Sequence, residues 1–256
     1  MFNLQDKVVL VTGGSRGIGE VTVRTLHQAG AAVILHYSQG EHQARQVATE
    51  LGSQADPERL HLVQADLSLA GAARGLWHQS LAWRGKVDAV VNNAATMPAA
   101  AIADDWDHWS AAWQQTLQVN LVAVADLCRE AIGHFQNQGG GILVNLASRA
   151  AFRGDSPEFM PYAASKGGIV GLTRTIARGF ARDGVLAYTI APGFVRTERI
   201  EEVMAERGAD YVTRDIPLGS PADPQDISNL IAFLVAGMAP HATGATFDVN
   251  GASYFH

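Results

Sequence analysis

The stretch KVVLVTGGSRGIG, residues 7–19, joins a short apolar run to a glycine-rich segment. Residues 7–11 predict a buried strand, and the glycine-rich segment leads into a helical pattern of apolar residues that ends near residue 30. Glycines spaced as Gly13, Gly17 and Gly19 permit a tight turn and let the backbone approach a pyrophosphate, which the N–H groups at the helix start can hold. This unit predicts a dinucleotide-binding fold; a glycine-rich turn without a ligand is the simpler alternative.

The rest of the chain continues the alternation of strands and helices. Further strands are predicted at residues 31–37, 60–66, 87–91, 142–146, 185–190 and 246–249. Further helices are predicted at residues 41–51, 70–83, 113–136, 162–182 and 227–235. Such alternation implies a parallel sheet with helices on both faces. The predicted fold class is therefore α/β, a single doubly wound Rossmann-type domain over residues 1–256 with about seven parallel strands.

Four polar residues stand at the ends of predicted strands: Thr12, Asp66, Asn92 and Ser148. In open α/β sheets, ligands bind beyond the carboxyl ends of the strands. We therefore expect these side chains to border one site.

Composition narrows the classes of partner. The chain has 256 residues, of which 47% are hydrophobic and 17% charged, and its formal net charge is −6 without a basic block. Nucleic acid and anionic membranes are therefore poor candidates as partners. No apolar run approaches the roughly 20 residues of a membrane helix, and no export signal is recognisable. Cys128 is the only cysteine, and the 9 histidines lack metal-ligand spacing. We predict a cytoplasmic protein without a metal site.

Tyr162 and Lys166 are four residues apart in a predicted helix, which places both on one face. A neighbouring ammonium favours the phenolate, so the pKa of Tyr162 is expected to fall toward neutrality. A phenol with such a pKa can exchange a proton with a carbonyl or alcohol oxygen. Taken alone, this spacing is more often accidental than catalytic.

The end of the second predicted strand bears on the choice of cofactor. NAD enzymes usually carry an acid there, but residues 35–40 (LHYSQG) contain none. Arg16 in the glycine segment can instead face a 2′-phosphate with bidentate hydrogen bonds, and Ser38 and His36 can add donors. NADP(H) is therefore favoured over NAD(H). The alternative for Arg16 is a solvated loop cation.

At this point the motifs, in their order along nearly the whole chain, resemble those of the short-chain dehydrogenases/reductases, of the type that includes the 3-oxoacyl-carrier-protein reductases. The motifs are TGGSRGIG at 12–19, Asp66-Leu67, Asn92-Asn93-Ala94-Ala95, Asn120, Ser148, Tyr162 with Lys166, Pro192-Gly193 with Thr197, and Val249-Asn250-Gly251.

The resemblance implies a role for each matching residue. Tyr162 is expected to be the general acid or base, Lys166 to lower its pKa and bind the nicotinamide ribose, Ser148 to hold the substrate oxygen, and Asn120 to support a proton path to the lysine. The expected cofactor-binding residues are Gly13, Ser15, Arg16, Gly17, Ile18, Gly19, His36, Tyr37, Ser38, Asp66, Leu67, Asn93, Ala94, Ala95, Tyr162, Lys166, Pro192, Gly193, Val195 and Thr197. The resemblance also implies a homotetramer with a small-molecule carbonyl or alcohol substrate.

The chain departs from the family pattern in three places. Ala95 stands where the family usually has glycine, Asn250-Gly251-Ala252 replaces a terminal glycine pair, and the spacing from Ser148 to Tyr162 is one residue longer than in many members. The longer spacing falls in residues 149–161, a predicted loop. Arg149 and Arg153 in this loop can attract an anionic substrate or form salt bridges with Asp155 or Glu158.

Residues 196–216 are charged and match the family segment that closes over the substrate, so we expect a mobile lid there. Trp106, Trp109 and Trp113 form a stripe at helical spacing, for which packing in the core or at a subunit interface is favoured over a role in a pocket wall.

The sequence thus predicts an NADP(H)-preferring oxidoreductase that transfers hydride between nicotinamide and a ketone or secondary alcohol, with a 3-oxoacyl thioester as the leading substrate candidate. The alternatives are a non-catalytic NADP(H)-binding regulator, an NAD-dependent alcohol dehydrogenase of the same family, and a sugar-nucleotide epimerase. The epimerases carry an additional substrate domain, for which 256 residues leave little room.

Overall fold

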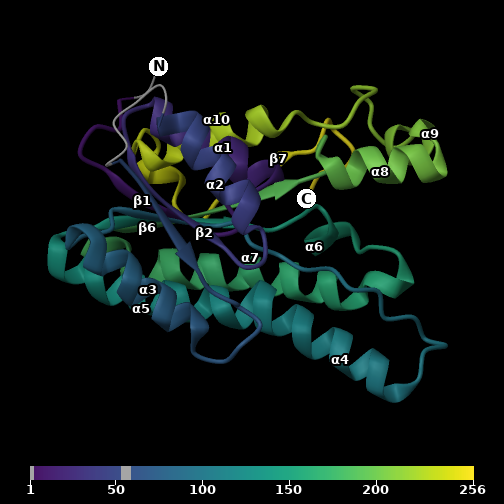
Figure 1. Ribbon diagram of the computed structural model, residues 1–256. Helices are drawn as coiled ribbons and strands as arrows, with labels where there is room; N and C mark the ends of the chain where they lie inside the picture. The colour runs from purple at the N-terminus through teal and green to yellow at the C-terminus, as the bar shows by residue number, and fades with distance from the viewer. Residues whose placement is uncertain (1–2, 53–58) are drawn as a thin grey trace.

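The computed structural model describes residues 3–52 and 59–256. Their centre is a seven-stranded sheet in which all neighbouring strands pair in parallel, in the order β3-β2-β1-β4-β5-β6-β7. The strands are β1 Val8–Val11, β2 Ala32–Tyr37, β3 Leu60–Gln64, β4 Ala89–Asn92, β5 Gly141–Leu146, β6 Val185–Pro192 and β7 Thr246–Val249. The sheet lies between two layers of helices (Figure 1). The predicted fold class is confirmed, and every strand was predicted to within two residues at either end.

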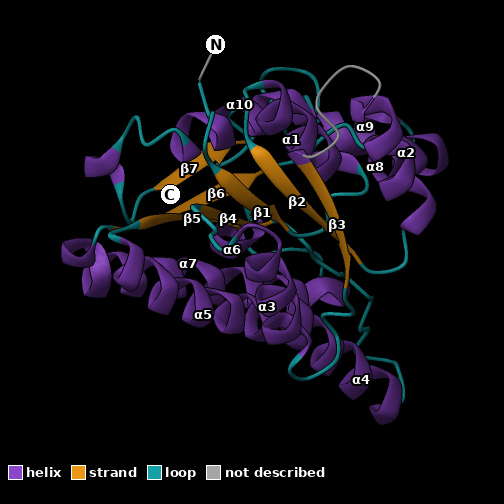
Figure 2. Ribbon diagram, turned by 60° about the vertical axis from the view of Figure 1, so that its left-hand side comes forward, coloured by secondary structure: helices purple, strands orange, loops and turns teal. Residues whose placement is uncertain are grey.

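The two helical layers are separated clearly in Figure 2. One layer holds α1 Gly17–Gln28, α2 Glu41–Gly52 and α10 Pro224–Val235, and the other holds α3 Ala72–Arg84, α4 Trp106–Leu117, α5 Ala123–Gln138 and α7 Met160–Phe180. The shorter helices are α6 Ala150–Arg153, α8 Glu198–Arg207, α9 Ala209–Thr213, η2 Gln118–Val122, η3 Pro157–Phe159, η4 Ala181–Asp183 and η5 Pro240–Ala242.

Alternation along each strand divides the core in two. In β1, Val8 and Leu10 pack into the cluster under α3, α5 and α7, whereas Val9 and Val11 pack into the cluster under α1, α2 and α10. Successive side chains of a strand point to opposite faces, and here both faces are covered. This is why the strands read as continuous apolar runs.

The order in which strands are added to the sheet reverses at β1. The chain adds β2 and then β3 on one side of β1, and crosses to the other side to add β4. Loops that leave the carboxyl ends of β1 and β4 therefore run in opposite directions and open a crevice between them. The residues that follow β1, β4, β5 and β6 border this crevice.

Three helical regions differ from the sequence prediction. The helix predicted at 113–136 begins at Trp106, because the Asp105 side chain caps it by accepting a 2.9 Å hydrogen bond from the backbone N–H of His108. A π-helical turn, η2, separates it from α5. Residues 149–161, predicted as loop, contain α6 and η3, and residues 196–216 contain α8 and α9.

The tryptophan stripe lies along α4. Trp106 and Trp109 stack with centroids 5.3 Å apart, and Trp109 contacts Trp113 at 5.4 Å. Trp106 is 71% exposed. None of the three lines the cavity that contains Tyr162, so the interpretation as a pocket wall is wrong.

Candidate functional site: a glycine turn and an adjoining cavity

The glycine turn between β1 and α1 leaves no room for side chains. Gly13 has φ +65° and Gly17 has φ +57°, and a Cβ at Gly19 would lie 2.0 Å from the carbonyl oxygen of Gly13. Asn93 fixes the turn from β4, because its Nδ2 donates to the carbonyls of Thr12 at 2.9 Å and Gly13 at 3.1 Å. The turn is thus a bare backbone surface that a flat phosphate chain can approach.

Helix α1 begins at this turn without a side-chain cap. The first N–H groups of a helix have no partner within the helix, and they attract anions. Together with the bare glycine surface, this end of α1 fits the pyrophosphate of a dinucleotide.

His36 supports the turn from behind. Its Nδ1 accepts a hydrogen bond from the backbone N–H of Gly13 at 3.1 Å, and its Nε2 lies 3.0 Å from the carbonyl of Ala65, to which it donates. Burial lowers the pKa of His36 from 6.5 to about 4, while the hydrogen bond to Ala65 opposes this shift. Both ring nitrogens are therefore used by backbone, and the ring is neutral at physiological pH.

His36→Asn is expected to flatten the acid limb of the stability curve. Between pH 4 and 6.5 the unfolded chain binds a proton at His36 that the folded chain does not, so unfolding free energy falls by about 1.4 kcal/mol per unit as the pH drops through this window. Asn retains an acceptor for Gly13 but does not titrate. Urea unfolding at several pH values measures the difference.

His42→Gln is the matched control, because His42 is exposed on α2. An acid limb that His36→Asn leaves as steep as in the wild type would contradict a neutral, buried His36.

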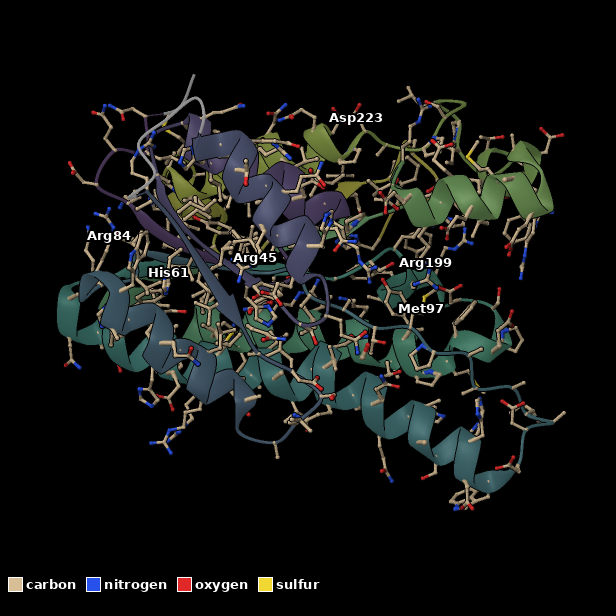
Figure 3. The ribbon with its side chains drawn as sticks, in the orientation of Figure 1. Arg45, His61, Arg84, Met97, Arg199 and Asp223 are labelled. Atoms are coloured by element: carbon tan, nitrogen blue, oxygen red, sulfur yellow. The ribbon has the colours of Figure 1, made fainter. Side chains whose placement is uncertain are left out.

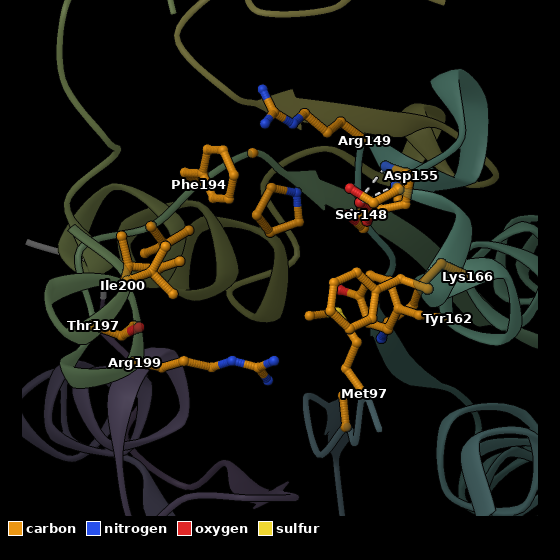
Figure 4. A pocket seen from close by; sticks show the side chains of 18 of the residues that line it. Met97, Ser148, Arg149, Asp155, Tyr162, Lys166, Phe194, Thr197, Arg199 and Ile200 are labelled. Carbon is orange, nitrogen blue, oxygen red and sulfur yellow. Dashed lines mark hydrogen bonds between the residues drawn. The ribbon is translucent and has the colours of Figure 1, made fainter. Parts of the chain in front are cut away.

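A cavity of about 530 Å³ opens beside the glycine turn (Figure 4). The predicted site residues that line it are Ile18, Asn93, Ala95, Ser148, Tyr162, Lys166, Pro192, Gly193, Val195 and Thr197. The other predicted site residues lie outside its wall: Gly13, Ser15, Arg16, Gly17, Gly19, His36, Tyr37, Ser38, Asp66, Leu67, Ala94 and Asn120. Segments from both helical layers meet at this cavity.

Tyr162 and Lys166 both lie in α7, as the spacing predicts, and Tyr162 and Ser148 line the cavity together. The pKa of Tyr162 is raised, because burial disfavours the phenolate. The nearby Ser148 hydroxyl and the Arg199 charge lower this pKa, whereas the Asp155 charge raises it. The sequence prediction of a lowered pKa is therefore wrong.

The position of the Lys166 ammonium explains why the pKa of Tyr162 is not lowered as predicted. Its Nζ lies 5.6 Å from the centroid of the Tyr162 ring and donates a 2.7 Å hydrogen bond to the carbonyl of Leu146 at the end of β5. Burial lowers the pKa of the ammonium to about 8. The ammonium is thus directed at a strand carbonyl, a partner that the motif spacing does not reveal.

Asn120 lies in the π-helical turn η2 and is fully buried. Its Oδ1 accepts from the backbone N–H of Thr96, and its Nδ2 donates to the carbonyl of Thr96 and to Oγ of Ser165 at 3.2 Å. Ser165 in turn donates to the carbonyl of Tyr162 at 2.7 Å. Ser165 therefore connects Asn120 to α7, a role that the sequence analysis did not assign.

The residues predicted around the adenosine half differ in their engagement. Arg16 is exposed, and its side chain forms no hydrogen bond or ion pair with any described residue. The carboxylate of Asp66 accepts hydrogen bonds from the backbone N–H and hydroxyl of Ser68, which lower its pKa. Asp66 thus caps the turn that follows β3.

Two arginines flank the cavity from the two ends of α6, Arg149 before its first residue and Arg153 as its last. Arg149 donates to Oγ of Ser253 at 2.7 Å and lies over the Phe194 ring, whereas Arg153 approaches Asp215 at 3.7 Å. The expected salt bridges to Asp155 or Glu158 do not form. Both arginines connect α6 to distant segments that also border the cavity.

In the described residues, no three His, Cys, Asp or Glu side chains are grouped as a metal site requires. None of the helices in residues 3–52 and 59–256 is both long and apolar enough to cross a membrane.

Comparison with known proteins places this geometry in a family. The model of the short chain dehydrogenase family matches residues 7–208. The chain is 34% identical to 3β-hydroxysteroid dehydrogenase 1 of Eggerthella lenta over 252 residues (97% of this chain and 94% of the relative). It is 32% identical to a 3-oxoacyl-[acyl-carrier-protein] reductase of Synechocystis sp. over 257 residues (98% of each chain).

A solved structure agrees with the sequence relatives. A candidate NAD(P)-dependent gluconate 5-dehydrogenase from Beutenbergia cavernae, with NADP bound at low occupancy, superposes with a TM-score of 0.88. That protein is 31% identical, and the match covers 98% of this chain and 97% of the other. The protein described here is therefore a member of the short-chain dehydrogenase/reductase family, an oxidoreductase that acts on CH–OH or C=O groups.

Proposed function

We propose that this protein is an NADP(H)-preferring oxidoreductase that interconverts a ketone and a secondary alcohol, with Tyr162 as the general acid or base. The observation that carries the proposal is that Tyr162 and Ser148 lie together in the wall of the cavity that adjoins the glycine turn. A bound nicotinamide supplies the hydride chemistry, and the protein supplies position and protons.

The raised pKa of Tyr162 bears on the direction of proton transfer. At neutral pH the phenol keeps its proton, which is the form that can protonate a carbonyl oxygen. Ser148 sits beside the phenol and can hold the same oxygen, while its own Oγ accepts from the backbone N–H of Ala150 at 3.1 Å. Because the phenol of Tyr162 is protonated, this arrangement supports reduction of a carbonyl better than oxidation of an alcohol, for which Tyr162 would have to lose its proton.

The roles proposed for the other site residues rest on their positions around the cavity. Lys166 at the cavity wall can reach a ribose hydroxyl, and Asn120 and Ser165 hold the backbone of the catalytic turn. The segment 196–216 borders the cavity through α8 and α9 and serves as the substrate lid. The homotetramer, the cytoplasmic location and the 3-oxoacyl thioester substrate stay predictions from the sequence.

Arg16→Ala is expected to weaken NADPH binding by about 10- to 100-fold and NADH binding by less than about twofold, because a charge-assisted bond to a 2′-phosphate is lost. Calorimetric titration with each nucleotide measures the affinities. A panel of ketones and aldehydes, followed by loss of NADPH absorbance, tests turnover in parallel.

Arg84→Ala is the matched control. Arg84 ends α3 and lies at the other end of the molecule from Arg199 and Met97, two residues that line the cavity (Figure 3). Equal losses for NADPH and NADH in Arg16→Ala would favour the NAD-dependent alternative. Tight NADPH binding without turnover on any carbonyl compound would instead favour the non-catalytic regulator.

A further inference from the structure

The charged side chains around the cavity are predominantly basic. Six basic residues line it, against the three acids Asp155, Glu206 and Asp215. The chain as a whole has the opposite balance, with a net charge of −6. A cavity that is basic within an acidic protein raises the local concentration of anions.

Arg199 stands apart from the other arginines of the cavity. Arg149 and Arg153 have the contacts given above, while the guanidinium groups of Arg207 and Arg214 lie over the Tyr211 ring at 5.1 and 5.7 Å. Among the described residues, the side chain of Arg199 has no hydrogen bond, ion pair or ring contact, although it lines the cavity. Its planar fork of donors is therefore free to bind a ligand.

The side chain of Arg199 points into the cavity. In Figure 4 its side chain extends from the first turn of α8 across the cavity toward Tyr162 and Met97, which belong to the opposite wall. Asp155 lies on the other side, beside Ser148. A substrate held at Tyr162 thus meets an unpaired cation on the α8 side and a carboxylate on the Ser148 side.

We propose that Arg199 is a specificity-determining residue that binds an anionic group of the substrate, a carboxylate or a phosphate, and thereby selects anionic carbonyl compounds. This inference rests on the proposed function, because the anion is placed relative to a carbonyl held by Tyr162 and Ser148. Asp155 repels the same anion, so the two charges together fix which end of the substrate faces α8. Since α8 belongs to the lid, binding of the anion also draws the lid against the opposite wall.

The test uses matched probe pairs in the full-length enzyme with NADPH. One arm compares 2-, 3- and 4-oxo acids with their methyl esters, and a second arm compares dihydroxyacetone phosphate with dihydroxyacetone. Wild type is expected to favour the anionic member of at least one pair by about 10- to 100-fold in kcat/KM, and Arg199→Gln is expected to abolish this preference. The arm that shows the effect identifies the anion.

Arg196→Gln is the matched control. Arg196 is exposed, lies three residues earlier, approaches Glu201 at 3.8 Å and does not line the cavity. It is expected to keep the full preference. Equal treatment of both members of every pair by the wild type would overturn the inference. An equal loss on both members in Arg199→Gln would also overturn it, since it would place Arg199 on the cofactor or in the fold.

A second readout separates this inference from the proposed function. Calorimetry on Tyr162→Phe loaded with NADPH measures binding of each probe without chemistry. Tighter binding of the anionic member, lost when Arg199→Gln is added, would support the inference even if no probe is turned over. No discrimination in this binding assay would overturn it, whatever the turnover.

Discussion

Tyr162→Phe is expected to lower kcat/KM for carbonyl reduction by about 10²- to 10⁴-fold, the range that a positioned general acid contributes. The change removes a single hydroxyl, and Phe fills the same space in the wall of the cavity. The affinity for NADPH is expected to stay within about twofold of wild type, because the loss falls on an interaction made with the reacting oxygen. Stopped-flow single-turnover kinetics and calorimetric titration with NADPH measure the two quantities.

Tyr188→Phe makes a stringent control for this change. Tyr188 is fully buried in β6 and donates a 2.8 Å hydrogen bond to the carbonyl of Ala239, away from the cavity. Its loss is expected to cost about 1 kcal/mol of unfolding free energy and to leave kcat/KM unchanged. If Tyr162→Phe behaved like Tyr188→Phe, with lower stability and full activity, Tyr162 would have no part in the mechanism.

Most of the fold could be predicted because its elements are determined locally. Strand β1 is buried on both faces, so residues 7–11 are apolar throughout, and the glycines that follow can form only a tight turn. Helix α8 was not predicted as a helix. Its apolar residues Ile200, Val203 and Met204 do recur at helical spacing, but none of its residues is buried, and charged side chains dominate the sequence 198–207.

Side-chain partners were harder to predict than elements. The spacing of Tyr162 and Lys166 correctly indicated a shared helix, but the strand carbonyl of Leu146 that binds Lys166 is 20 residues away in sequence. His36 was expected among the cofactor donors, yet its two nitrogens hold Gly13 and Ala65. In both residues the tertiary partner is a backbone group, and backbone groups leave no mark on the sequence.

Lys166→Met is expected to reduce kcat/KM by about 10²-fold or more while leaving the folded protein as stable as wild type or more stable at pH 7, because a buried cation is replaced by an apolar side chain of similar length. Lys166 is 3% exposed, and its pKa falls from 10.5 to about 8 on burial. At pH 7, below both values, the ammonium is charged in the folded and the unfolded chain, and its burial opposes folding. Activity and stability are thus expected to move in opposite directions, as they do for residues retained for function.

The pH dependence of stability distinguishes this account from a structural role for Lys166. Between pH 8 and 10.5 the unfolded chain retains a proton on Lys166 that the folded chain has released, so this residue makes unfolding free energy rise by about 1.4 kcal/mol per pH unit. Lys166→Met is expected to lose that rise, whereas Lys86→Met, at a surface lysine 3.1 Å from Asp88, is expected to retain it. Urea unfolding from pH 7 to 10.5 measures both. A variant that loses stability at pH 7 together with activity would mean that Lys166 supports the fold through Leu146, and that the loss of turnover follows from the damage.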